Sequence, residues 1–350
     1  GAYFGAITPL ADALRESPTR FWESTPETFE RPHDYVLYLG CNVLRTVNLA
    51  ESIGAVLRAM GVDFVALGGP ANCCGIVHHR NGDTAVSSKL TRHTLAKFQR
   101  VRPKAVLVYC PSCHTHMDEV LPEGEFGFDV PYLHVTEFIA ERLASLPIRR
   151  RVERRVALHT HSARPQQRQD ADSTLAILRA IPGLEVEELC AIPDWGYHCG
   201  PPQLAALGPQ RLEALVAELY GEAKARGCDA VVAVYHSCYS ELLAREARHG
   251  LEFLNYVELL MAALGLGPLE PRYKAFKLAQ DPDGAYAALA PRAEARGANL
   301  PRLRKSLQTH FGLAAPAPGR EGGSSCAAPA GPRHNAHYPL RGNLPPTALT

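Results

Sequence analysis

Five cysteines in the first third of the chain follow a spacing that suits metal binding. In chain order they are Cys41, Cys73, Cys74, Cys110 and Cys113. The second and third are adjacent and precede Gly75, and the last two enclose a Pro-Ser dipeptide. A Cys-x-x-Cys turn can direct two thiolates at one centre, and an adjacent pair can do the same where glycine lets the backbone bend. Tetrahedral zinc takes four ligands, so five converging thiolates favour a cluster with more than one metal.

The second half of the chain carries a related set in which histidine replaces part of the cysteine. Cys74 and Cys199 are 125 residues apart, and so are Cys113 and Cys238, which indicates an internal duplication. The candidate metal ligands of this half are His161, His198, Cys199, His236 and Cys238. Imidazole with thiolate suits zinc, and can also hold a modified iron–sulfur cluster, because histidine replaces cysteine in some centres. The third alternative is a site that has lost its metal, whose histidines only form hydrogen bonds.

These second-half ligands follow from aligning the motifs of the two halves. His198 stands before the second Cys-Gly pair, where the first half has cysteine. His236 stands before the second Ser-Cys pair and is aligned with Cys110. The equivalent of Cys41, placed by strand ends, falls in the segment His-Thr-His that ends at His161.

Short apolar runs alternate with longer amphipathic stretches, which predicts βα units on mostly parallel sheets. The expected strands are Tyr35–Leu39, Phe64–Leu67, Ala105–Tyr109, Val156–Leu158, Val186–Leu189 and Ala230–Val234. The expected helices are Leu49–Met60, Thr84–Val101, Val135–Leu146, Ser173–Ala180, Leu212–Arg226 and Ser240–Arg248. Because sites in open α/β sheets lie outside the carboxyl ends of the strands, the metal ligands are expected to meet there.

The expected fold class is therefore α/β, with two duplicated βαβ-type halves, metal sites at strand carboxyl ends and an extended C-terminal tail. The first domain carries the complete cysteine motif and the second the histidine variant. The expected parts are an N-terminal arm (1–33), the first domain (34–150), the second domain (151–268), a helical docking segment (269–313) and a flexible tail rich in Ala, Pro and Gly (314–350).

Composition excludes several classes of protein. With 46% apolar and 21% charged residues the chain is globular, and a formal net charge of +1 leaves no basic field for nucleic acid. No apolar run approaches the roughly 20 residues of a membrane-spanning helix, and no leader precedes the first segment. We therefore expect a cytoplasmic protein that is not transmembrane, although the chain begins at Gly1 and a start can have been trimmed.

The five-cysteine spacing and the duplicated half together resemble the CCG cysteine-rich domains of the B-type subunit of heterodisulfide reductase. This resemblance covers about residues 34–265. Relatives include B-type subunits of bacterial sulfur-oxidising heterodisulfide-reductase-like complexes, and iron–sulfur subunits of glycolate, lactate and some succinate oxidation systems. In that family each complete motif binds a non-cubane [4Fe-4S] cluster, so the resemblance implies one such cluster on the five first-half cysteines. The second motif departs at three of its five positions, which argues against disulfide cleavage between two clusters.

The resemblance implies an oxidoreductase subunit that is active within a complex and acts on sulfur groups. Electron transfer would be coupled to thiol/disulfide or sulfane-sulfur chemistry, with a small or protein-bound thiol or disulfide as substrate. No Gly-x-Gly-x-x-Gly follows a strand, so flavin is expected on another subunit. The implied partners are two other subunits of the complex, one ferredoxin-like (C type) and one flavin-binding (A type). The alternatives are an iron–sulfur subunit of a glycolate, lactate or succinate system, and a zinc-binding structural or scaffold subunit.

Four histidines lie close to the first-half cysteines in the sequence. They are His78, His79, His114 and His116. Such residues can hydrogen-bond to cluster sulfur or relay protons, and the alternative is that they are exposed at helix starts.

Overall fold

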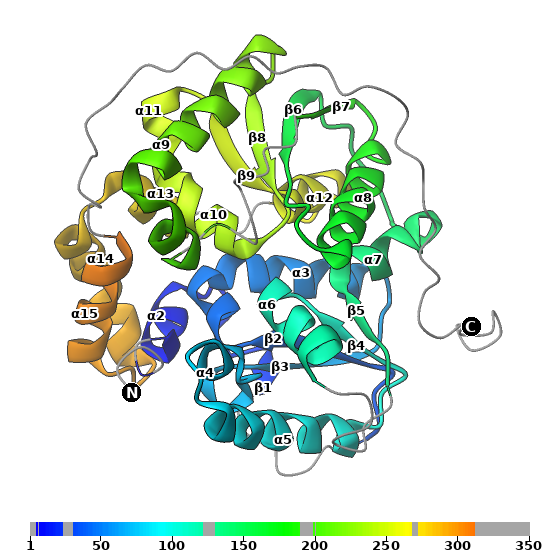
Figure 1. Cartoon of the computed structure of the whole chain (residues 1–350), viewed down its shortest axis with the longest axis vertical. Coiled ribbons are helices and arrows are strands. Elements are labelled where there is room, and N and C mark those ends of the chain that lie inside the picture. Colours follow the sequence, from blue (N-terminus) through cyan, green and yellow to red (C-terminus); the bar gives the residue numbers. More distant parts are fainter. Residues whose placement is uncertain are drawn as a thin grey trace.

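The computed structural model describes residues 5, 7–23, 31–121, 130–189, 199, 201–267 and 272–311. Within these ranges the chain forms two α/β lobes, one above the other in Figure 1. Each lobe is built on its own sheet, and every strand pair in both sheets is parallel. The fold class expected from the sequence is confirmed, while the tail from residue 312 lies outside the described residues.

The first sheet has five strands in the order β1-β3-β2-β4-β5. The strands are β1 (Trp22–Glu23), β2 (Tyr35–Gly40), β3 (Phe64–Gly68), β4 (Ala105–Val108) and β5 (Tyr132–His134). The helices of this lobe are α3 (Val47–Ala59), α4 (Ile76–Arg80), α5 (Thr84–Val101), α6 (Pro111–Thr115) and α7 (Val135–Ala140). Every residue of β2 and β4 is buried, which is typical of central parallel strands covered on both faces.

The second sheet has four strands in the order β7-β6-β8-β9. The strands are β6 (Arg154–His159), β7 (Leu184–Glu188), β8 (Ala230–Ala233) and β9 (Glu252–Asn255). The helices are α8 (Pro165–Arg179), α9 (Pro201–Ala225), α10 (His236–Leu242), α11 (Glu246–His249) and α12 (Tyr256–Leu264). This order matches β3-β2-β4-β5 of the first sheet, so the two halves repeat the same topology.

Sheet register shows which residues of the two halves are equivalent. Tyr38 pairs with Val108 in the first sheet, and His159 pairs with Ala233 in the second. Val108 and Ala233 are 125 residues apart, the same offset that relates the cysteines of the two motifs. His159 is therefore the counterpart of Tyr38, and this correspondence fixes the comparison of the two sites below.

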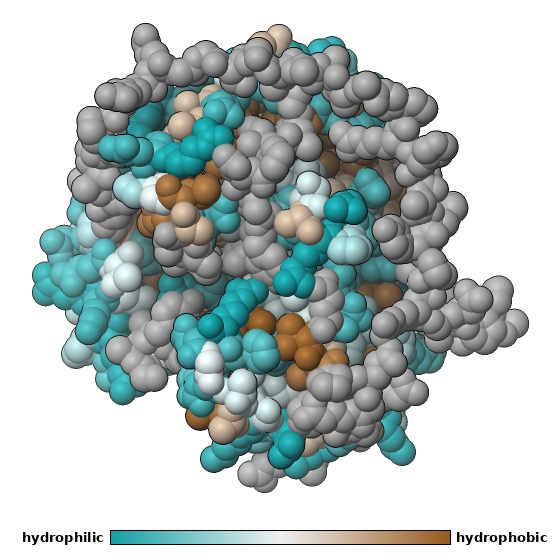
Figure 2. Space-filling model, viewed as in Figure 1, coloured by the Kyte–Doolittle hydropathy of each residue, from teal (hydrophilic) through white to brown (hydrophobic). Residues whose placement is uncertain are grey.

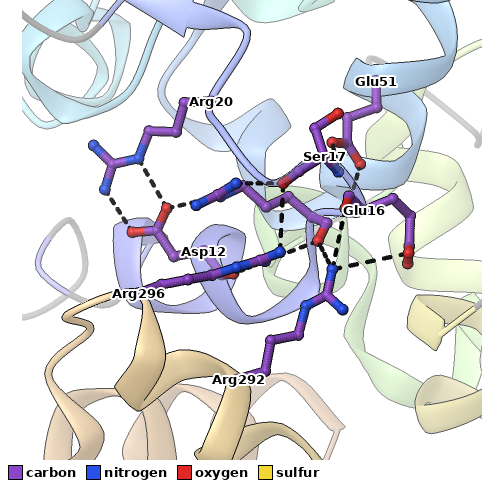
Figure 3. A network of polar contacts seen from close by, with 8 residues as sticks. Asp12, Glu16, Ser17, Arg20, Glu51, Arg292 and Arg296 are labelled. Atoms are coloured by element: carbon purple, nitrogen blue, oxygen red, sulfur yellow. Dashed lines mark hydrogen bonds and ion pairs between the residues drawn. The ribbon is translucent and has the colours of Figure 1, made fainter.

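Three helices end the described part of the chain, and the last two of them pack beside the N-terminal helix α2 (Ile7–Leu14), as Figure 1 shows. They are α13 (Arg272–Ala279), α14 (Pro282–Ala295) and α15 (Leu300–Phe311). In Figure 3, Arg296 donates hydrogen bonds to the carbonyl oxygens of Asp12 (2.6 Å) and Arg15 (2.9 Å). Arg292 donates to the carbonyl of Arg15 as well. The segment expected to be helical thus contacts the start of its own chain, and docking to another subunit stays a prediction.

Two other features concern the surface and the membrane. Figure 2 shows apolar side chains scattered among polar ones on this face of the molecule, in several places and not as one continuous area. Within the ranges that the structure describes, no helix is both long enough and apolar enough to cross a membrane.

Candidate functional site

The five first-half cysteines lie at the carboxyl ends of three adjacent strands. One follows β2, two follow β3 and two follow β4, and each is buried: Cys41, Cys73, Cys74, Cys110 and Cys113. Helix α6 begins directly after Cys110, which has extended backbone, so the strand runs into the helix without a loop. The structure brings together all five residues that the spacing singled out.

The sulfur atoms form a continuous string of contacts. The Sγ atoms of Cys41 and Cys73 are 3.9 Å apart. Cys73 also interacts with its neighbour Cys74, which in turn contacts Cys113 across the gap between two strand ends. The string ends at Cys110, hydrogen-bonded to Cys113. Five sulfurs in a row extend over more than one metal position, unlike the four corners of a single tetrahedral ion.

Two glycines make room for this string. Gly40 has a positive φ of 60°, and a Cβ there would lie 2.8 Å from the Sγ of Cys113. Gly75 has φ 93°, and a Cβ there would lie 2.7 Å from the carbonyl oxygen of Ser87. Its own N–H points at the Sγ of Cys73 over 3.4 Å. The bend after the cysteine pair therefore depends on glycine, as the sequence predicted.

Two of the five thiols have lowered pKa values, which favours their thiolate form. Hydrogen bonds from Cys41 and Cys74 lower the pKa of Cys73, and a hydrogen bond from Cys113 lowers the pKa of Cys110. Hydrogen bonding to Cys73 and burial raise the pKa of Cys41. The lowered pKa values of Cys73 and Cys110 favour negative charge in this buried group, which a bound cation would compensate. Metal binding would displace the protons of the remaining thiols.

Helix α5 fixes the segment that carries the adjacent pair. The hydroxyl of Thr94 donates to the carbonyl of Cys73 (2.9 Å), and the hydroxyl of Thr91 donates to the carbonyl of Cys74 (2.8 Å). His116 Nε2 lies 3.1 Å from the Thr91 hydroxyl, and burial lowers the pKa of this histidine to about 4. A neutral His116 therefore contacts the site through Thr91.

A histidine of the second half completes the surroundings of the first-half site. His236, the first residue of α10, hydrogen-bonds Cys110 and helps to lower the pKa of that thiol. Its ring stacks on Tyr109 with the centroids 6.4 Å apart. The counterpart of Cys110 by register is Tyr235, so His236 occupies the position of Pro111 and faces the other half. It does not join the second-half ligands with which the motif alignment grouped it.

A compact group of ligand atoms lies at the strand ends of the second half. It comprises His159, His161, Cys199 and Cys238, whose ligand atoms all lie within 4.8 Å of one another. All four side chains are buried, with exposed fractions of 0–3%. The predicted ligand His198 lies outside the described residues. The sequence predicted three of these ligands, His161, Cys199 and Cys238, but not His159. One signal could have found it, because residues two apart on a strand point to the same side.

Buried polar side chains connect the two halves beside these sites. The hydroxyl of Tyr235 donates to Asp170 Oδ2 (2.7 Å), and Asp170 Oδ1 lies 3.5 Å from His134 Nδ1. His134 stacks on His114, and Tyr235 stacks on His161. Burial raises the pKa of Asp170 to about 6 and lowers the pKa of His134 to about 4. The network links first-half histidines to a second-half ligand.

Comparison with protein families identifies the first half. Residues 35–118 match the family model of the CCG cysteine-rich domain, a range that contains all five first-half cysteines. The resemblance to a CCG cysteine-rich domain seen in the sequence is confirmed for these residues of the first half.

Three curated relatives share moderate similarity with the chain. A "Probable membrane-anchored ferredoxin" of Chromohalobacter salexigens is 29% identical over 164 residues, 45% of this chain and 24% of the relative. A "Probable iron-sulfur-binding oxidoreductase FadF" of Bacillus subtilis is 24% identical over 45% of this chain and 22% of the relative. The D-type subunit of dihydromethanophenazine:CoB--CoM heterodisulfide reductase of Methanosarcina acetivorans is 23% identical over 47% of this chain and 42% of the relative. The chain thus matches less than half the length of each relative.

Solved structures give weaker likenesses. An aspartate racemase homologue from Pyrococcus horikoshii overlaps with a TM-score of 0.32 and 12% identity, over 67% of this chain and 97% of the other. Glutamate racemase from Francisella tularensis overlaps with a TM-score of 0.30 and 14% identity, over 67% and 79%. Overlap this low carries no argument about function.

Proposed function

We propose that the protein is an iron–sulfur electron-transfer subunit of a multi-subunit oxidoreductase. The observation that carries this proposal is the buried string of five thiols at the ends of β2, β3 and β4. The match to a CCG domain and the similarity to a ferredoxin, an iron–sulfur-binding oxidoreductase and a heterodisulfide reductase subunit support it.

The donor set fits a non-cubane [4Fe-4S] cluster held by Cys41, Cys73, Cys74, Cys110 and Cys113. Thiolate sulfur is the usual ligand of iron–sulfur clusters, and a cluster of this kind supplies one-electron chemistry at a sulfur-rich centre. The protein positions the thiolates on three strand ends, and Gly40 leaves space beside one of them. Hydrogen bonds from Gly75 N–H and His236 to two of the sulfurs would set the reduction potential.

The proposed reaction is electron transfer coupled to thiol/disulfide or sulfane-sulfur chemistry within a heterodisulfide-reductase-like complex. Similarity to one heterodisulfide reductase protein supports this choice. The proposed partners are the ferredoxin-like (C type) and flavin-binding (A type) subunits of such a complex. A cytoplasmic location stays a prediction.

A second candidate function is the iron–sulfur subunit of a glycolate, lactate or succinate oxidation system. It is favoured by similarity to an iron–sulfur-binding oxidoreductase whose name refers to no disulfide. The same five thiolates would serve either function. The two functions differ in the electron donor. Reduction of the purified protein by a reduced ferredoxin-like partner would support the first function, and reduction by a 2-hydroxy-acid dehydrogenase would support the second.

The first experiment is metal analysis of protein purified without oxygen. We expect about four iron and four acid-labile sulfide per chain, with an EPR signal in the oxidised, thiol-treated form. Cys113→Ser should lose most of the iron. The control is Cys228→Ser, because Cys228 is buried in the second half but outside both ligand groups. Protein that contains zinc but neither iron nor sulfide would instead support the zinc-binding scaffold.

A further inference from the structure

We propose that the second half binds one metal ion, with zinc as the best match, through His159, His161, Cys199 and Cys238. This site is separate from the first-half cluster and does not depend on the function proposed above. Its ligand set also differs from a second copy of the five-cysteine motif, because only two of the four ligands are cysteines.

Three distances between the ligand atoms are close to those between the ligands of a tetrahedral ion. Zinc bonds of about 2.3 Å to sulfur and 2.0–2.1 Å to nitrogen place tetrahedral ligands about 3.3–3.8 Å apart. His159 Nε2 lies 3.3 Å from Cys199 Sγ, and His161 Nε2 lies 3.2 Å from Cys238 Sγ. Cys199 Sγ and His161 Nε2 are 3.7 Å apart. Four donors at this spacing need little movement to surround one ion.

The ligands come from three separate segments. His159 ends β6, and His161 follows two residues later. Cys199 precedes α9, and Cys238 lies in the first turn of α10. An ion would therefore link the end of one strand to the starts of two helices. With all four positions supplied by buried side chains, such a site is closed, which is typical of structural zinc.

Comparison with the first half shows why a single ion suits this site better than a cluster. By register His161 is the counterpart of Gly40, two residues beyond the pair His159 and Tyr38. In the first half Gly40 leaves the space that the sulfur of Cys113 requires. In the second half His161 stands at the equivalent position, and its Nε2 lies 3.2 Å from the Sγ of Cys238, the counterpart of Cys113.

A second replacement removes another cluster ligand. Tyr235 is the counterpart of Cys110, and its hydroxyl donates to Asp170 while its ring stacks on His161. A tyrosine that already has a hydrogen-bond partner and supports a ligand ring is not available as a fifth ligand. Compared with the first half, the second half thus has fewer thiolates and less room between the strand ends. Such a site suits one ion better than a cluster.

The test is metal content of the full chain, purified without oxygen in the presence of zinc, with iron measured in the same samples. We expect about one zinc per chain in addition to the iron. Cys238→Ser and His161→Ala should lose the zinc and keep the iron. His249→Gln is the control, because His249 stacks on Tyr220 away from the ligands, and it should keep both metals. His236→Ala should also keep the zinc, although the motif alignment made it a ligand.

Two further measurements keep the proposal testable if a variant folds poorly. His161→Cys supplies a replacement ligand and should retain zinc where His161→Ala does not. Cobalt(II) substituted for zinc should give the visible absorption of a tetrahedral cobalt–thiolate site, and Cys238→Ser should abolish it. The proposal is overturned if the chain holds about eight iron and eight sulfide, or if zinc stays unchanged in both His161→Ala and Cys238→Ser. Loss of iron with zinc retained would contradict the cluster and leave this site standing.

Discussion

His236 of the second half hydrogen-bonds Cys110 of the first half. The contact crosses the boundary between the two lobes, so the environment of the proposed cluster is not complete within one half of the duplication. A change in the packing of α10 against the first half would therefore alter the chemistry of a cysteine ligand more than 120 residues away in the sequence.

Replacing His236 should change the cluster potential without removing iron. A hydrogen bond to cluster sulfur favours the reduced, more negative state, so His236→Ala is expected to lower the midpoint potential. A hydrogen bond to a charged group is worth about 1.5–3 kcal/mol. Only part of that energy differs between the oxidised and reduced cluster, so we expect the midpoint potential to fall by roughly 30–60 mV for a one-electron couple. An EPR-monitored redox titration measures it, with His249→Gln as control. An unchanged potential with full iron would show that the contact does not tune the site.

Substitution of Gly40 by alanine should prevent cluster assembly. The new Cβ would meet the sulfur of Cys113 at 2.8 Å, and the backbone is in the left-handed region. Gly61→Ala is a matched control, because Gly61 has a similar φ of 73° but nothing within 4 Å of its Cβ. Both variants carry the backbone cost of about 1–2 kcal/mol. Iron content should fall strongly only in Gly40→Ala, and equal iron in the two proteins would contradict the steric argument.

Asp170→Asn should stabilise the protein above neutral pH. Burial raises the folded-state pKa of Asp170 to about 6 from an ordinary value of 3.8, so the folded chain disfavours the ionised carboxylate. The ionised carboxylate therefore lowers the free energy of unfolding. This loss grows as the pH rises from about 4 to 6 and reaches about 3 kcal/mol. Denaturant unfolding of metal-loaded protein should show the gain at pH 7.5 and its absence at pH 4. The control is Asp172→Asn on the exposed side of the same helix. A gain that is the same at both pH values would contradict this assignment.

Arg296→Ala should release the N-terminal helix. Arg296 donates to two carbonyl groups at the end of α2, and removing a hydrogen-bonding partner of buried groups costs about 1–3 kcal/mol. Hydrogen exchange of residues 7–14 should become faster, with a lower free energy of unfolding. Arg304→Ala is the comparison, because Arg304 forms an exposed ion pair with Asp283. Equal exchange in the two variants would show that Arg296 does not hold α2.

The strands that position the site were predictable because they are continuous apolar runs. β2, β3, β4 and β8 lie within a residue or so of their expected bounds. The strands β1, β5 and β9 were not expected, since they have two to four residues and contain polar side chains. The expected helix Val135–Leu146 ends at Ala140, and a short 3-10 turn, Leu143–Ser145, follows.

The cysteine string was predictable and the second ligand group only in part. Spacing and strand ends suffice for the first site, because five thiols at adjacent strand ends have one place to meet. For the second site, motif alignment matched His236 to Cys110, whereas strand pairing matches Tyr235 to it. The direction in which His236 points depends on how α10 packs against the other half. A local sequence pattern does not predict that packing. His159 could have been found, because it is the last residue of β6 and stands only two residues before the predicted ligand His161.

Packing of α2 against α14 and α15 also constrains the order of events during synthesis. Ile7, Leu10 and Leu14 are buried, yet two of the helices that contact α2 lie near the other end of the described chain. Domains tend to fold from the N-terminus as they leave the ribosome, and α2 can pack early against the turn Asn42–Thr46 and α3. Its contacts with α14 and α15 form only after residues 282–311 have been made. A nascent chain that ends before these helices would leave the face of α2 that they cover exposed. The first lobe therefore reaches its final packing only after most of the chain has been translated.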